Sequence, residues 1–467
     1  MAEGLSALSA RESMRPIPTL KISISGVRGV VGESLTPNLL TRFAQAFGTY
    51  IGARTIVIGR DPRTSGEMVK QAVVAGLLSS GCGIVDIGMC PVPTVQLLVR
   101  HHRAHGGIAI TASHNPAEWN ALKFIGRDGF FLNSGQAREL LDIYHQGEYT
   151  RVSGAEMREV IELPGATDLH IQTIADELGP IPTAKKKLRV VLDACNGAGS
   201  IAGPKLLAAL GAEVFTLNVT PDGSFPRGAE PLAENLGDLC AAVKAHHADV
   251  GFAQDMDSDR LAIVSEEGVA IGEEYTLLLA TLHVLGKTPG SVVANLSSTS
   301  ALREVVNKFG GRLFWSKIGE VNVTEEMQKQ NSVIGGEGNG GVIYPRLNFA
   351  RDSLVGMALI LRLLAETGQT ITELVNSLPR FAMIKEKMTC PSDKVASVIR
   401  KLRREYAARP MDLRDGVKVS LDNGWFLVRP SNTEPIIRVI AEAEHDAAAR
   451  AIMDRVYSQV RECFGQP

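Results

Sequence analysis

The chain has 467 residues, 45% of them hydrophobic, and its 49 Lys and Arg residues nearly balance its 51 Asp and Glu residues. This composition is typical of a globular protein that is long enough for several domains. The formal net charge of -2 excludes the strong basic excess that binding to nucleic acid or to an anionic membrane favours. We therefore expect neither kind of partner, and we expect any affinity for phosphate to be local.

The cysteines are scattered, and no pair has the CxxC spacing that is typical of zinc sites or redox motifs. The first residues contain no apolar stretch long enough for a signal peptide, and the apolar run 275–285 is far shorter than a membrane span. We expect a cytoplasmic protein with reduced thiols and a loose start of about a dozen residues.

The predicted elements, taken in chain order, repeat three times. Each repeat begins with a β-branched strand, continues through an amphipathic helix that closes at glycine, and re-enters a second strand. The first strands are expected at 55–61, 188–193 and 291–295. A third, apolar strand follows in each repeat, at 107–111, 248–253 and 332–335. These are βαβ units of parallel sheets covered by helices.

The pattern changes after Pro379. A helix is expected at 392–406, then strands at 416–421 and 424–428 joined by the hairpin turn Asp422–Gly424, and a last helix at about 445–463. We therefore predict three related α/β domains and a smaller α+β domain. Their predicted ranges are 1–165, 166–272, 273–380 and 381–467.

Polar or glycine-rich loops leave the carboxyl ends of the three third strands. They are Thr111–Pro116, Gln254–Arg260 and Gly336–Gly341. Ligands of open α/β sheets bind outside the carboxyl ends of the strands, so the three loops could face one cleft.

Ser113 lies between Ala112 and His114 and is followed by a turn at Asn115-Pro116 that should lift the loop off its strand. A serine nucleophile needs exposure, a proton acceptor and nearby cations. Without further context, a Ser-His pair in a loop is ordinary turn chemistry. Arg28 and Lys123 are cations in the same repeat, although a surface salt bridge would explain each of them equally well.

Asp255, Asp257 and Asp259 alternate along the second loop, so in an extended segment their side chains point the same way. At about 4 Å and an effective dielectric constant near 20, each pair of carboxylates repels by roughly 4 kcal/mol, a cost that a bound cation removes. Oxygen ligands without His or Cys favour Mg²⁺. A solvated acidic turn is the alternative.

Two further loops fit the parts of a sugar phosphate. Glu337 is the only charge in its glycine-rich loop and is better suited to polyol hydroxyls than to phosphate, unless the loop is simply a flexible turn. The segment Arg429–Pro435, with Arg438 just beyond it, combines a bidentate donor with short polar side chains and turn amides, which suits a phosphate clamp. A helix-capping turn is the alternative.

Together these motifs resemble the α-D-phosphohexomutases, in the same order and over essentially the whole chain. Members of that family are phosphoglucomutases, phosphomannomutases and phosphoglucosamine mutases. The resemblance implies three related α/β domains with mixed sheets and a smaller C-terminal α+β domain around a central cleft. The variant present here looks most like the archaeal-type phosphoglucosamine mutases.

The resemblance also implies roles for residues. Ser113 corresponds to the serine that carries the phosphoryl group and completes the Mg²⁺ site of Asp255, Asp257 and Asp259. His114, Lys123 and Arg28 match positions around the reacting phosphate, with Lys123 a candidate general acid or base. The implied substrate-binding residues are Arg260, Lys317, Glu320, Glu337, Asn339, Arg429, Ser431, Asn432, Thr433 and Arg438.

The implied reaction interconverts 6-phospho and 1-phospho hexoses through a sugar 1,6-bisphosphate, which also serves as activator. The expected partner is a small-molecule sugar phosphate, and the expected state is a monomer or homodimer. An acidic residue at Glu320, near the 2-position of the sugar, would favour an ammonium group over a hydroxyl. We therefore expect glucosamine phosphate to be preferred, with glucose or mannose phosphate as the alternatives.

The sequence departs from the family pattern at a few positions. Met256 in the metal loop and Ala121 before Lys123 replace common glycines, the sugar loop has Asn339-Gly340 where many members have serine and glycine followed by histidine, and Glu320 stands where many have histidine. Two rival functions remain. A metal-dependent phosphatase would share the serine and the metal, and a non-catalytic sensor of sugar phosphates could have lost Ser113 or an aspartate.

Overall fold

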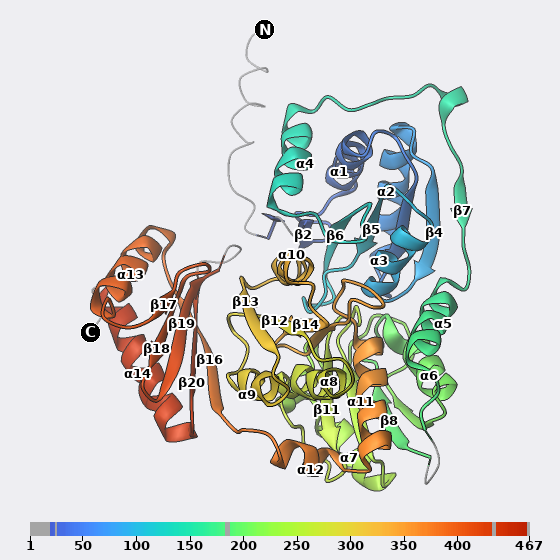
Figure 1. Ribbon diagram of the computed structural model, residues 1–467. Helices are drawn as coiled ribbons and strands as arrows, with labels where there is room; N and C mark the ends of the chain where they lie inside the picture. The colour runs from blue at the N-terminus through green and yellow to red at the C-terminus, as the bar shows by residue number, and fades with distance from the viewer. Residues whose placement is uncertain (1–18, 24–25, 183–186, 432–435, 465–467) are drawn as a thin grey trace.

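The computed structural model describes residues 19–23, 26–182, 187–431 and 436–464. These residues form four domains, each with its own sheet (Figure 1). Domain I has strand order β1-β2-β6-β5-β3-β4-β7. Its elements are β1 (Lys21–Ser23), β2 (Gly26–Val30), α1 (Pro37–Tyr50), β3 (Ile56–Arg60), α2 (Gly66–Ser79), β4 (Ile84–Met89), α3 (Val92–His101), β5 (Gly106–Ile110), β6 (Trp119–Gly126), α4 (Ser134–Gln146) and β7 (Val160–Glu162).

Domains II and III each have a four-stranded sheet, ordered β11-β10-β8-β9 and β13-β12-β14-β15. Domain II contains α5 (Ala166–Leu178), β8 (Arg189–Asp193), α6 (Gly199–Ala209), β9 (Glu213–Leu217), α7 (Gly237–Ala245), β10 (Val250–Gln254) and β11 (Leu261–Ser265). Domain III contains α8 (Glu274–Lys287), β12 (Ser291–Asn295), α9 (Ala301–Lys308), β13 (Arg312–Ser316), α10 (Glu320–Gln330), β14 (Ile334–Glu337), β15 (Gly341–Ile343), α11 (Ser353–Thr367) and α12 (Ile371–Asn376).

The threefold repeat is present in the structure. In domain I the order β4-β3-β5 is parallel, in domain II β9-β8-β10, and in domain III β13-β12-β14. A further strand, which the sequence pattern did not predict, follows each third strand. These strands, β6, β11 and β15, pair antiparallel with β5, β10 and β14. Each of the three loops therefore connects two neighbouring strands, and the sheets are mixed.

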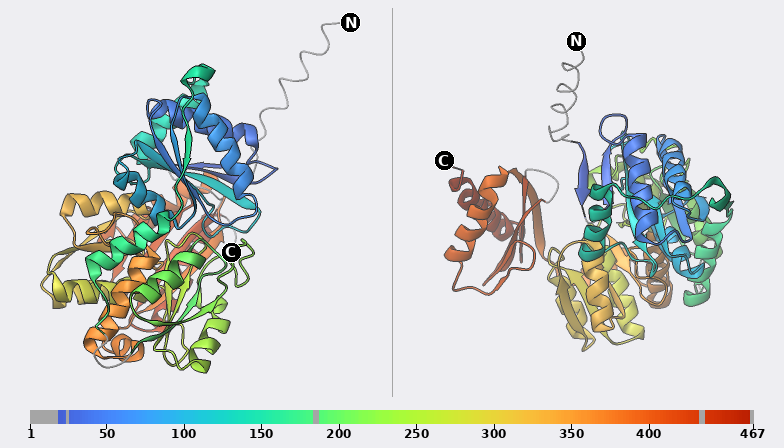
Figure 2. Two further views of the ribbon diagram at one scale, coloured as in Figure 1. Left: turned by 90° about the vertical axis from the view of Figure 1, so that its right-hand side faces the viewer. Right: turned by 90° about the horizontal axis from the view of Figure 1, so that it is seen from above.

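Domain IV is a separate lobe beside domain III (Figures 1 and 2). Its antiparallel sheet has the order β16-β20-β19-β18-β17. Its elements are β16 (Ala382–Thr389), α13 (Ser392–Glu405), β17 (Met411–Asp412), β18 (Val417–Leu421), β19 (Gly424–Pro430), β20 (Ile436–Ala443) and α14 (Asp446–Glu462). Helices α13 and α14 cover one face of the sheet, and that face holds the apolar core of the lobe.

Apolar packing joins the domains to different degrees. Domains II and III share one buried cluster, in which α11 is apolar and buried along most of its length. Domain IV contacts domain III through a small cluster that includes Leu296, Trp425 and Leu427. At this boundary the Lys418 ammonium lies 4.8 Å from the ring centroid of Trp315 and 3.7 Å from that of Trp425. Within the described part of the chain, no helix is long and apolar enough to cross a membrane.

Candidate active site

The serine loop connects β5 to β6. Ser113 has a left-handed backbone (φ +49°), and its N–H donates to the Thr111 hydroxyl at 2.9 Å. The serine is only 6% exposed, whereas the sequence predicted an exposed turn. The Thr111 hydroxyl in turn donates to Asp61 at 2.6 Å. The loop is therefore held inward, and Ser113 faces the neighbouring domain instead of bulk water.

Arg63 is the residue that holds the serine loop, and the sequence analysis missed it. The residue is 1% exposed, and its guanidinium donates to the carbonyl oxygens of Ser113 and Asn115 at 2.7 Å and of Trp119 at 2.9 Å. It also pairs with Asp61 at 3.0 Å. Carbonyl acceptors belong to every residue and leave no sequence pattern. The only available signal was a charged pair, Asp61 and Arg63, directly after a strand.

The metal loop connects β10 to β11. Asp255, Asp257 and Asp259 are fully buried, and one oxygen of each lies within 4.8 Å of the others. The left-handed residue of this loop is Ser258 (φ +60°), so Met256 does not require the conformational freedom of glycine. The alternating carboxylates therefore converge, and the alternative of a solvated acidic turn is wrong.

Each aspartate has one oxygen held by the protein and one left open. Asp255 Oδ1 accepts from the N–H groups of Asp259 at 3.0 Å and Arg260 at 3.1 Å, and Asp257 Oδ2 accepts from Lys123 at 2.7 Å. Asp259 Oδ2 accepts from Arg351. Among the residues described, the second oxygens, Asp255 Oδ2, Asp257 Oδ1 and Asp259 Oδ1, accept no hydrogen bond. Three buried, converging and open carboxylate oxygens fit Mg²⁺.

The pKa values of this cluster reflect burial and the charges that surround each carboxylate. Burial, and then the charges of Asp259 and Asp257, raise the pKa of Asp255 well above its ordinary value. Burial also acts to raise the pKa of Asp257, but Lys123 and then Arg351 outweigh it and hold that pKa below its ordinary value. A divalent cation between the open oxygens would remove the repulsion among them.

His114 connects the serine loop to the metal loop. Its Nδ1 lies 3.4 Å from Ser113 Oγ and 3.3 Å from the Arg260 guanidinium. Burial, and then the neighbouring charges of Arg260 and Arg28, lower the pKa of His114 well below its ordinary value, so the imidazole is neutral. Because arginine can only donate, Nδ1 is the acceptor and the proton is on Nε2. His114 Nδ1 can therefore accept a hydrogen bond from the Ser113 hydroxyl.

Arg260 and Arg28 supply positive charge to the two sides of the serine loop. Arg260 donates to Glu230 at 3.1 Å, and its Nε lies 3.9 Å from Asp255 Oδ2. Arg28 donates to Asn115 at 3.1 Å. A small hollow lies between Arg28 and Lys123, and Thr111, Ala112 and Ala121 also line it.

The sugar loop connects β14 to β15. Glu337 Oε1 accepts from Asn295 at 2.7 Å and from the Gly319 N–H at 2.8 Å, and Oε2 accepts from Arg351 at 2.7 Å. The side-chain Oδ1 of Asn339 accepts from the Gly341 N–H at 3.3 Å, and the backbone oxygen of Gly340 accepts from the Leu261 N–H at 3.1 Å. The last contact attaches this loop to the strand that follows the metal loop.

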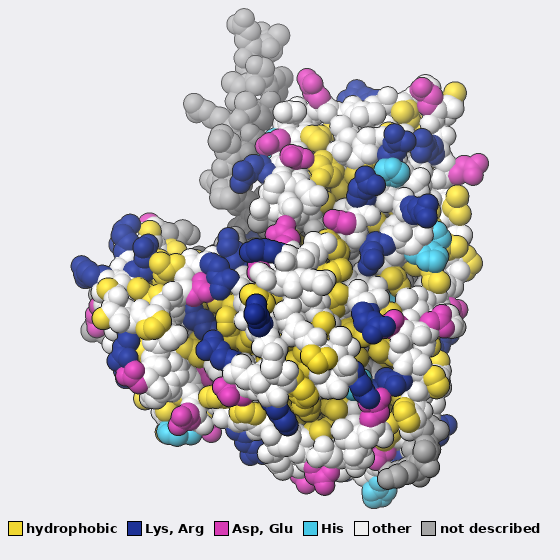
Figure 3. Space-filling model, in the orientation of Figure 1, with side chains coloured by type: hydrophobic (Ala, Val, Ile, Leu, Met, Phe, Trp, Pro, Cys, Tyr) yellow, Lys and Arg dark blue, Asp and Glu magenta, His cyan; other side chains and the backbone are white. Residues whose placement is uncertain are grey.

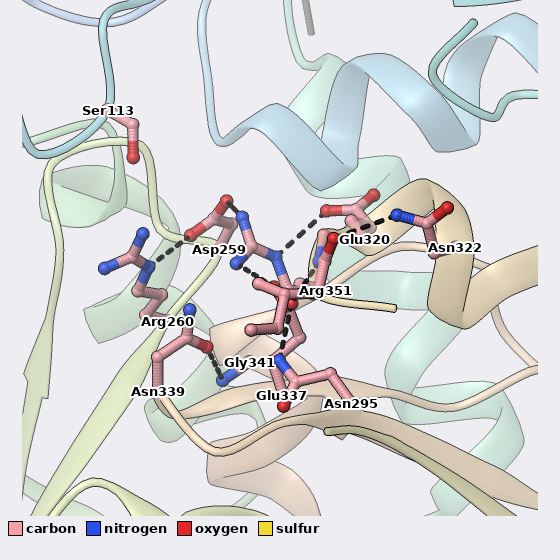
Figure 4. A network of polar contacts seen from close by, with 12 residues as sticks. Ser113, Asp259, Arg260, Asn295, Glu320, Asn322, Glu337, Asn339, Gly341 and Arg351 are labelled. Carbon is pink, nitrogen blue, oxygen red and sulfur yellow. Dashed lines mark hydrogen bonds and ion pairs between the residues drawn. The ribbon is translucent and has the colours of Figure 1, made fainter. Parts of the chain in front are cut away.

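Glu320 is the first residue of α10, not a member of a loop as the sequence suggested. It is 7% exposed, and it accepts from Gln96 at 3.0 Å and from Arg351 at 3.1 Å. Glu320 and Glu337 thus meet at one guanidinium (Figure 4). A buried carboxylate must be paired, which explains why both acids turn towards Arg351. Lys317, three residues earlier, is exposed.

Domain IV contributes a row of cations. Lys387, Arg438 and Arg429 are direct neighbours across β16, β20 and β19, so they lie on the same face of the sheet. Arg429 pairs with Asp415 at 2.9 Å. Figure 3 shows lysine and arginine side chains gathered along the border between this lobe and the rest of the molecule. Like charges in direct opposition favour an anion between them. Ser431 adjoins this row, whereas Asn432 and Thr433 lie outside the described residues.

The structure thus brings together most of the candidates. Direct contacts join the serine loop to the metal loop, and the metal loop to the sugar loop. The contact between the sugar loop and domain IV is weaker, because Lys385 approaches the Gly338 oxygen at 3.5 Å. Lys385 also pairs with Glu273 at 2.7 Å and with Glu274 at 2.8 Å.

Comparison with known proteins agrees with this arrangement. Phosphoglucomutase/phosphomannomutase models match along the chain: alpha/beta/alpha domain I at residues 20–151, domain II at 168–268, domain III at 272–381 and the C-terminal domain at 384–459. A probable phosphoglucosamine mutase of Methanopyrus kandleri is 39% identical over 94% of this chain and 97% of its own length. A phosphoglucomutase/phosphomannomutase of Thermococcus kodakarensis is 36% identical over 92% and 96%.

The fold agrees as well. The solved structure of a phosphoglucomutase/phosphomannomutase family protein from Burkholderia thailandensis has a TM-score of 0.83 and 27% identity, covering 95% of this chain and 98% of that one. One conclusion follows from four consecutive domain matches, two full-length relatives above 30% identity and a shared architecture. The chain belongs to the phosphoglucomutase/phosphomannomutase family and is an intramolecular phosphotransferase.

Proposed function

We propose that the enzyme interconverts the 1-phosphate and 6-phosphate of a hexose through a phosphorylated Ser113 and a sugar 1,6-bisphosphate. One observation carries this proposal: the serine loop and the strand β6 that follows it contact the metal loop directly. Lys123 binds Asp257 at 2.7 Å, and Arg260 approaches His114 at 3.3 Å. A phosphoryl group on Ser113 would therefore lie among Lys123, Arg260 and the open oxygens of the three aspartates.

The proposed step exchanges one phosphorus–oxygen bond for another. A sugar hydroxyl oxygen forms a bond to phosphorus while the bond from phosphorus to Ser113 Oγ breaks. The sugar hydroxyl loses its proton and Ser113 Oγ gains one, so no further reactant is needed. We assign both proton transfers to Lys123, which would accept the proton of the sugar hydroxyl as general base and return a proton to Ser113 Oγ as general acid, while His114 Nδ1 orients Ser113 by accepting its hydrogen bond. Mg²⁺ on Asp255, Asp257 and Asp259 would neutralise the charge that phosphoryl transfer develops.

A positional mutase needs a second phosphate site, and a phosphatase does not. The row Lys387, Arg438 and Arg429 in domain IV supports such a site, because it offers concentrated positive charge on the face that adjoins domain III. We propose that this row, with Ser431, Asn432 and Thr433, grips the phosphate that does not react. The bisphosphate would then turn over between the two sites.

We propose glucosamine phosphate as the preferred substrate. The name of the Methanopyrus kandleri relative supports this choice. The Thermococcus kodakarensis relative favours phosphoglucomutase or phosphomannomutase activity as the second candidate. The argument from an acidic Glu320 is weaker than the sequence suggested, because both of its oxygens already accept hydrogen bonds. An ammonium group would have to compete with Arg351 or Gln96 for them.

The test measures turnover of the 6-phosphates of glucosamine, glucose and mannose by purified enzyme, together with its intact mass. We expect one added phosphate on the wild type, none on Ser113→Ala, and a loss of several orders of magnitude in turnover by that variant. Ser134→Ala, at an exposed serine of α4, is the matched control. Near-normal activity of Ser113→Ala refutes the phosphoserine, and release of free phosphate supports a phosphatase.

The same assay tests the metal and the sugar. Exhaustive chelation should abolish turnover and added Mg²⁺ should restore it, because the buried carboxylates otherwise repel the phosphoserine. Full activity after chelation contradicts the metal site. The highest kcat/KM should belong to glucosamine 6-phosphate. If glucose or mannose phosphate is about tenfold better, a difference of about 1.4 kcal/mol, the amino-sugar assignment is wrong and the general mutase remains.

A further inference from the structure

Arg351 lies between β15 and α11, 8% exposed, with carboxylates from three different segments around it (Figure 4). Its Nε donates to Glu320 at 3.1 Å, one terminal nitrogen donates to Glu337 at 2.7 Å, and the other pairs with Asp259. A buried guanidinium that satisfies three separate acids is expensive to desolvate, so its placement calls for a function.

Asp259 shows what Arg351 does at the metal site. A carboxylate can rotate about its terminal bond and exchange its two oxygens. Arg351 holds Oδ2, and Oδ1 accepts no hydrogen bond from the residues that the structure describes. Arg260 comes no closer to Oδ1 than 3.7 Å. Among the residues described, Arg351 is therefore the donor that fixes which oxygen Asp259 presents to a cation.

The other two aspartates are also held by hydrogen-bond donors, one set from domain II itself and one from domain I. Asp255 is held by backbone N–H groups of its own loop in domain II, and Asp257 is held by Lys123 of domain I. Asp259 is held by Arg351 of domain III. All three ligands belong to domain II, yet each of three domains supplies the donor that orients one of them. Such supporting donors commonly control metal affinity.

The shape of the guanidinium explains why arginine occupies this position. Its planar fork can address three acceptors in fixed directions, whereas a lysine ammonium at the end of a flexible stem is a point charge. The chain also leaves room for it, because a Cβ on Gly341 would lie 2.4 Å from Arg351 Cδ. Packing against Arg351 thus explains why glycine stands at position 341, at the end of the sugar loop.

We propose that Arg351 is the positioning residue that orients Asp259 for the metal and ties it to Glu337, so that the metal loop and the sugar loop form one rigid unit. The inference rests on the metal site of the proposed function. Arg351 acts through Asp259 and Glu337 and does not itself touch the metal.

The test measures Mn²⁺ binding to metal-free protein by electron paramagnetic resonance, without any sugar. Arg351→Gln and Arg351→Lys should each weaken Mn²⁺ binding about ten- to a hundredfold, since losing a supporting donor has that effect in other metal sites. The matched control is Arg346→Gln, five residues earlier, whose side chain is 61% exposed and pairs with Glu177. It should bind Mn²⁺ like the wild type.

A further variant guards against misfolding. Gly341→Ala keeps the charge of Arg351 but pushes its side chain aside, so it should weaken Mn²⁺ binding and raise the Mg²⁺ concentration needed for half-maximal turnover. Wild-type Mn²⁺ affinity in Arg351→Lys and Gly341→Ala overturns the proposed role of Arg351 and leaves the metal site intact. Absence of Mn²⁺ binding by the wild type overturns the metal site and the role of Arg351 together.

Discussion

Glu320 is a buried acid whose protonation is set by its surroundings. Burial raises its pKa to about 7, although Arg351 acts to lower it. Between the ordinary value of 4.5 and about 7, the folded protein keeps this proton and the unfolded chain releases it. Stability contributed by the group therefore falls as the pH rises through this window and levels off above it.

Glu320→Gln should remove this dependence. Relative to the variant, the wild type should lose up to roughly 3 kcal/mol of unfolding free energy between pH 4.5 and 7, following 1.36 kcal/mol for each pKa unit. Denaturant unfolding of both proteins at several pH values, with chelator present throughout, measures the difference. An identical pH dependence in the two proteins contradicts the raised pKa.

At the residue scale, the sequence predicted the charged residues that recur at a regular spacing. It did not predict the arginines whose partners are backbone carbonyl groups or distant acids. The alternating aspartates converge as predicted, although their loop is a turn with a left-handed Ser258 and not the extended segment from which the prediction was made. Arg63 and Arg351 were not predicted, because their partners are backbone oxygens or acids far away in the chain. The direction in which Glu320 and Glu337 point was not predictable either, since it depends on a cation contributed by a different segment.

At the scale of elements, each loop of the site connects a parallel strand to the antiparallel strand beside it. The sequence predicted the βαβ order but not β6, β11 or β15, because a short apolar run is compatible with either a strand or part of a helix. The close spacing of the two strands in each pair places strict demands on the loop. The sugar loop also lies close to β11: at Gly340, which is left-handed (φ +89°), a Cβ would lie 2.3 Å from the Leu261 oxygen.

Gly340→Ala should therefore lower the free energy of unfolding by more than backbone strain alone would. Gly52 is also left-handed (φ +71°), but a Cβ there meets nothing within 4 Å. Gly52→Ala should cost about 1 kcal/mol from strain alone, whereas Gly340→Ala should cost clearly more and reduce turnover, because it separates the sugar loop from β11. Thermal unfolding and mutase assays on both variants measure this. Equal losses of stability in the two variants would show that the loop can move away from β11.

At the scale of the whole molecule, a buried polar relay joins the first three domains. The Thr94 hydroxyl on α3 lies 2.9 Å from His170 Nδ1 on α5, and His170 Nε2 lies 2.9 Å from Asp352, which caps α11. All three side chains are at most 2% exposed. Since Asp352 follows Arg351 directly, the relay also fixes the backbone from which Arg351 reaches the metal loop.

His170→Ala should leave Thr94 and Asp352 without this partner and lower the unfolding free energy by about 2 to 4 kcal/mol, a value typical of broken buried polar contacts. It should also weaken metal binding through Arg351. His101→Ala, at an exposed histidine of α3, is the control. Unfolding curves and Mn²⁺ titration of both variants measure the effects, and wild-type stability of His170→Ala would contradict a joining role.

The position of Lys418 between two indole rings has an optical consequence. The chain has 3 tryptophans, and two of them, Trp315 in domain III and Trp425 in domain IV, flank this ammonium. A nearby cation shifts the emission of an indole ring. Any tilt of the C-terminal lobe against domain III should therefore change the emission wavelength and the intensity of the intrinsic fluorescence. Replacing Trp119 with phenylalanine would leave the boundary pair as the only tryptophans, and the tryptophan emission would then report movement of the lobe without a dye.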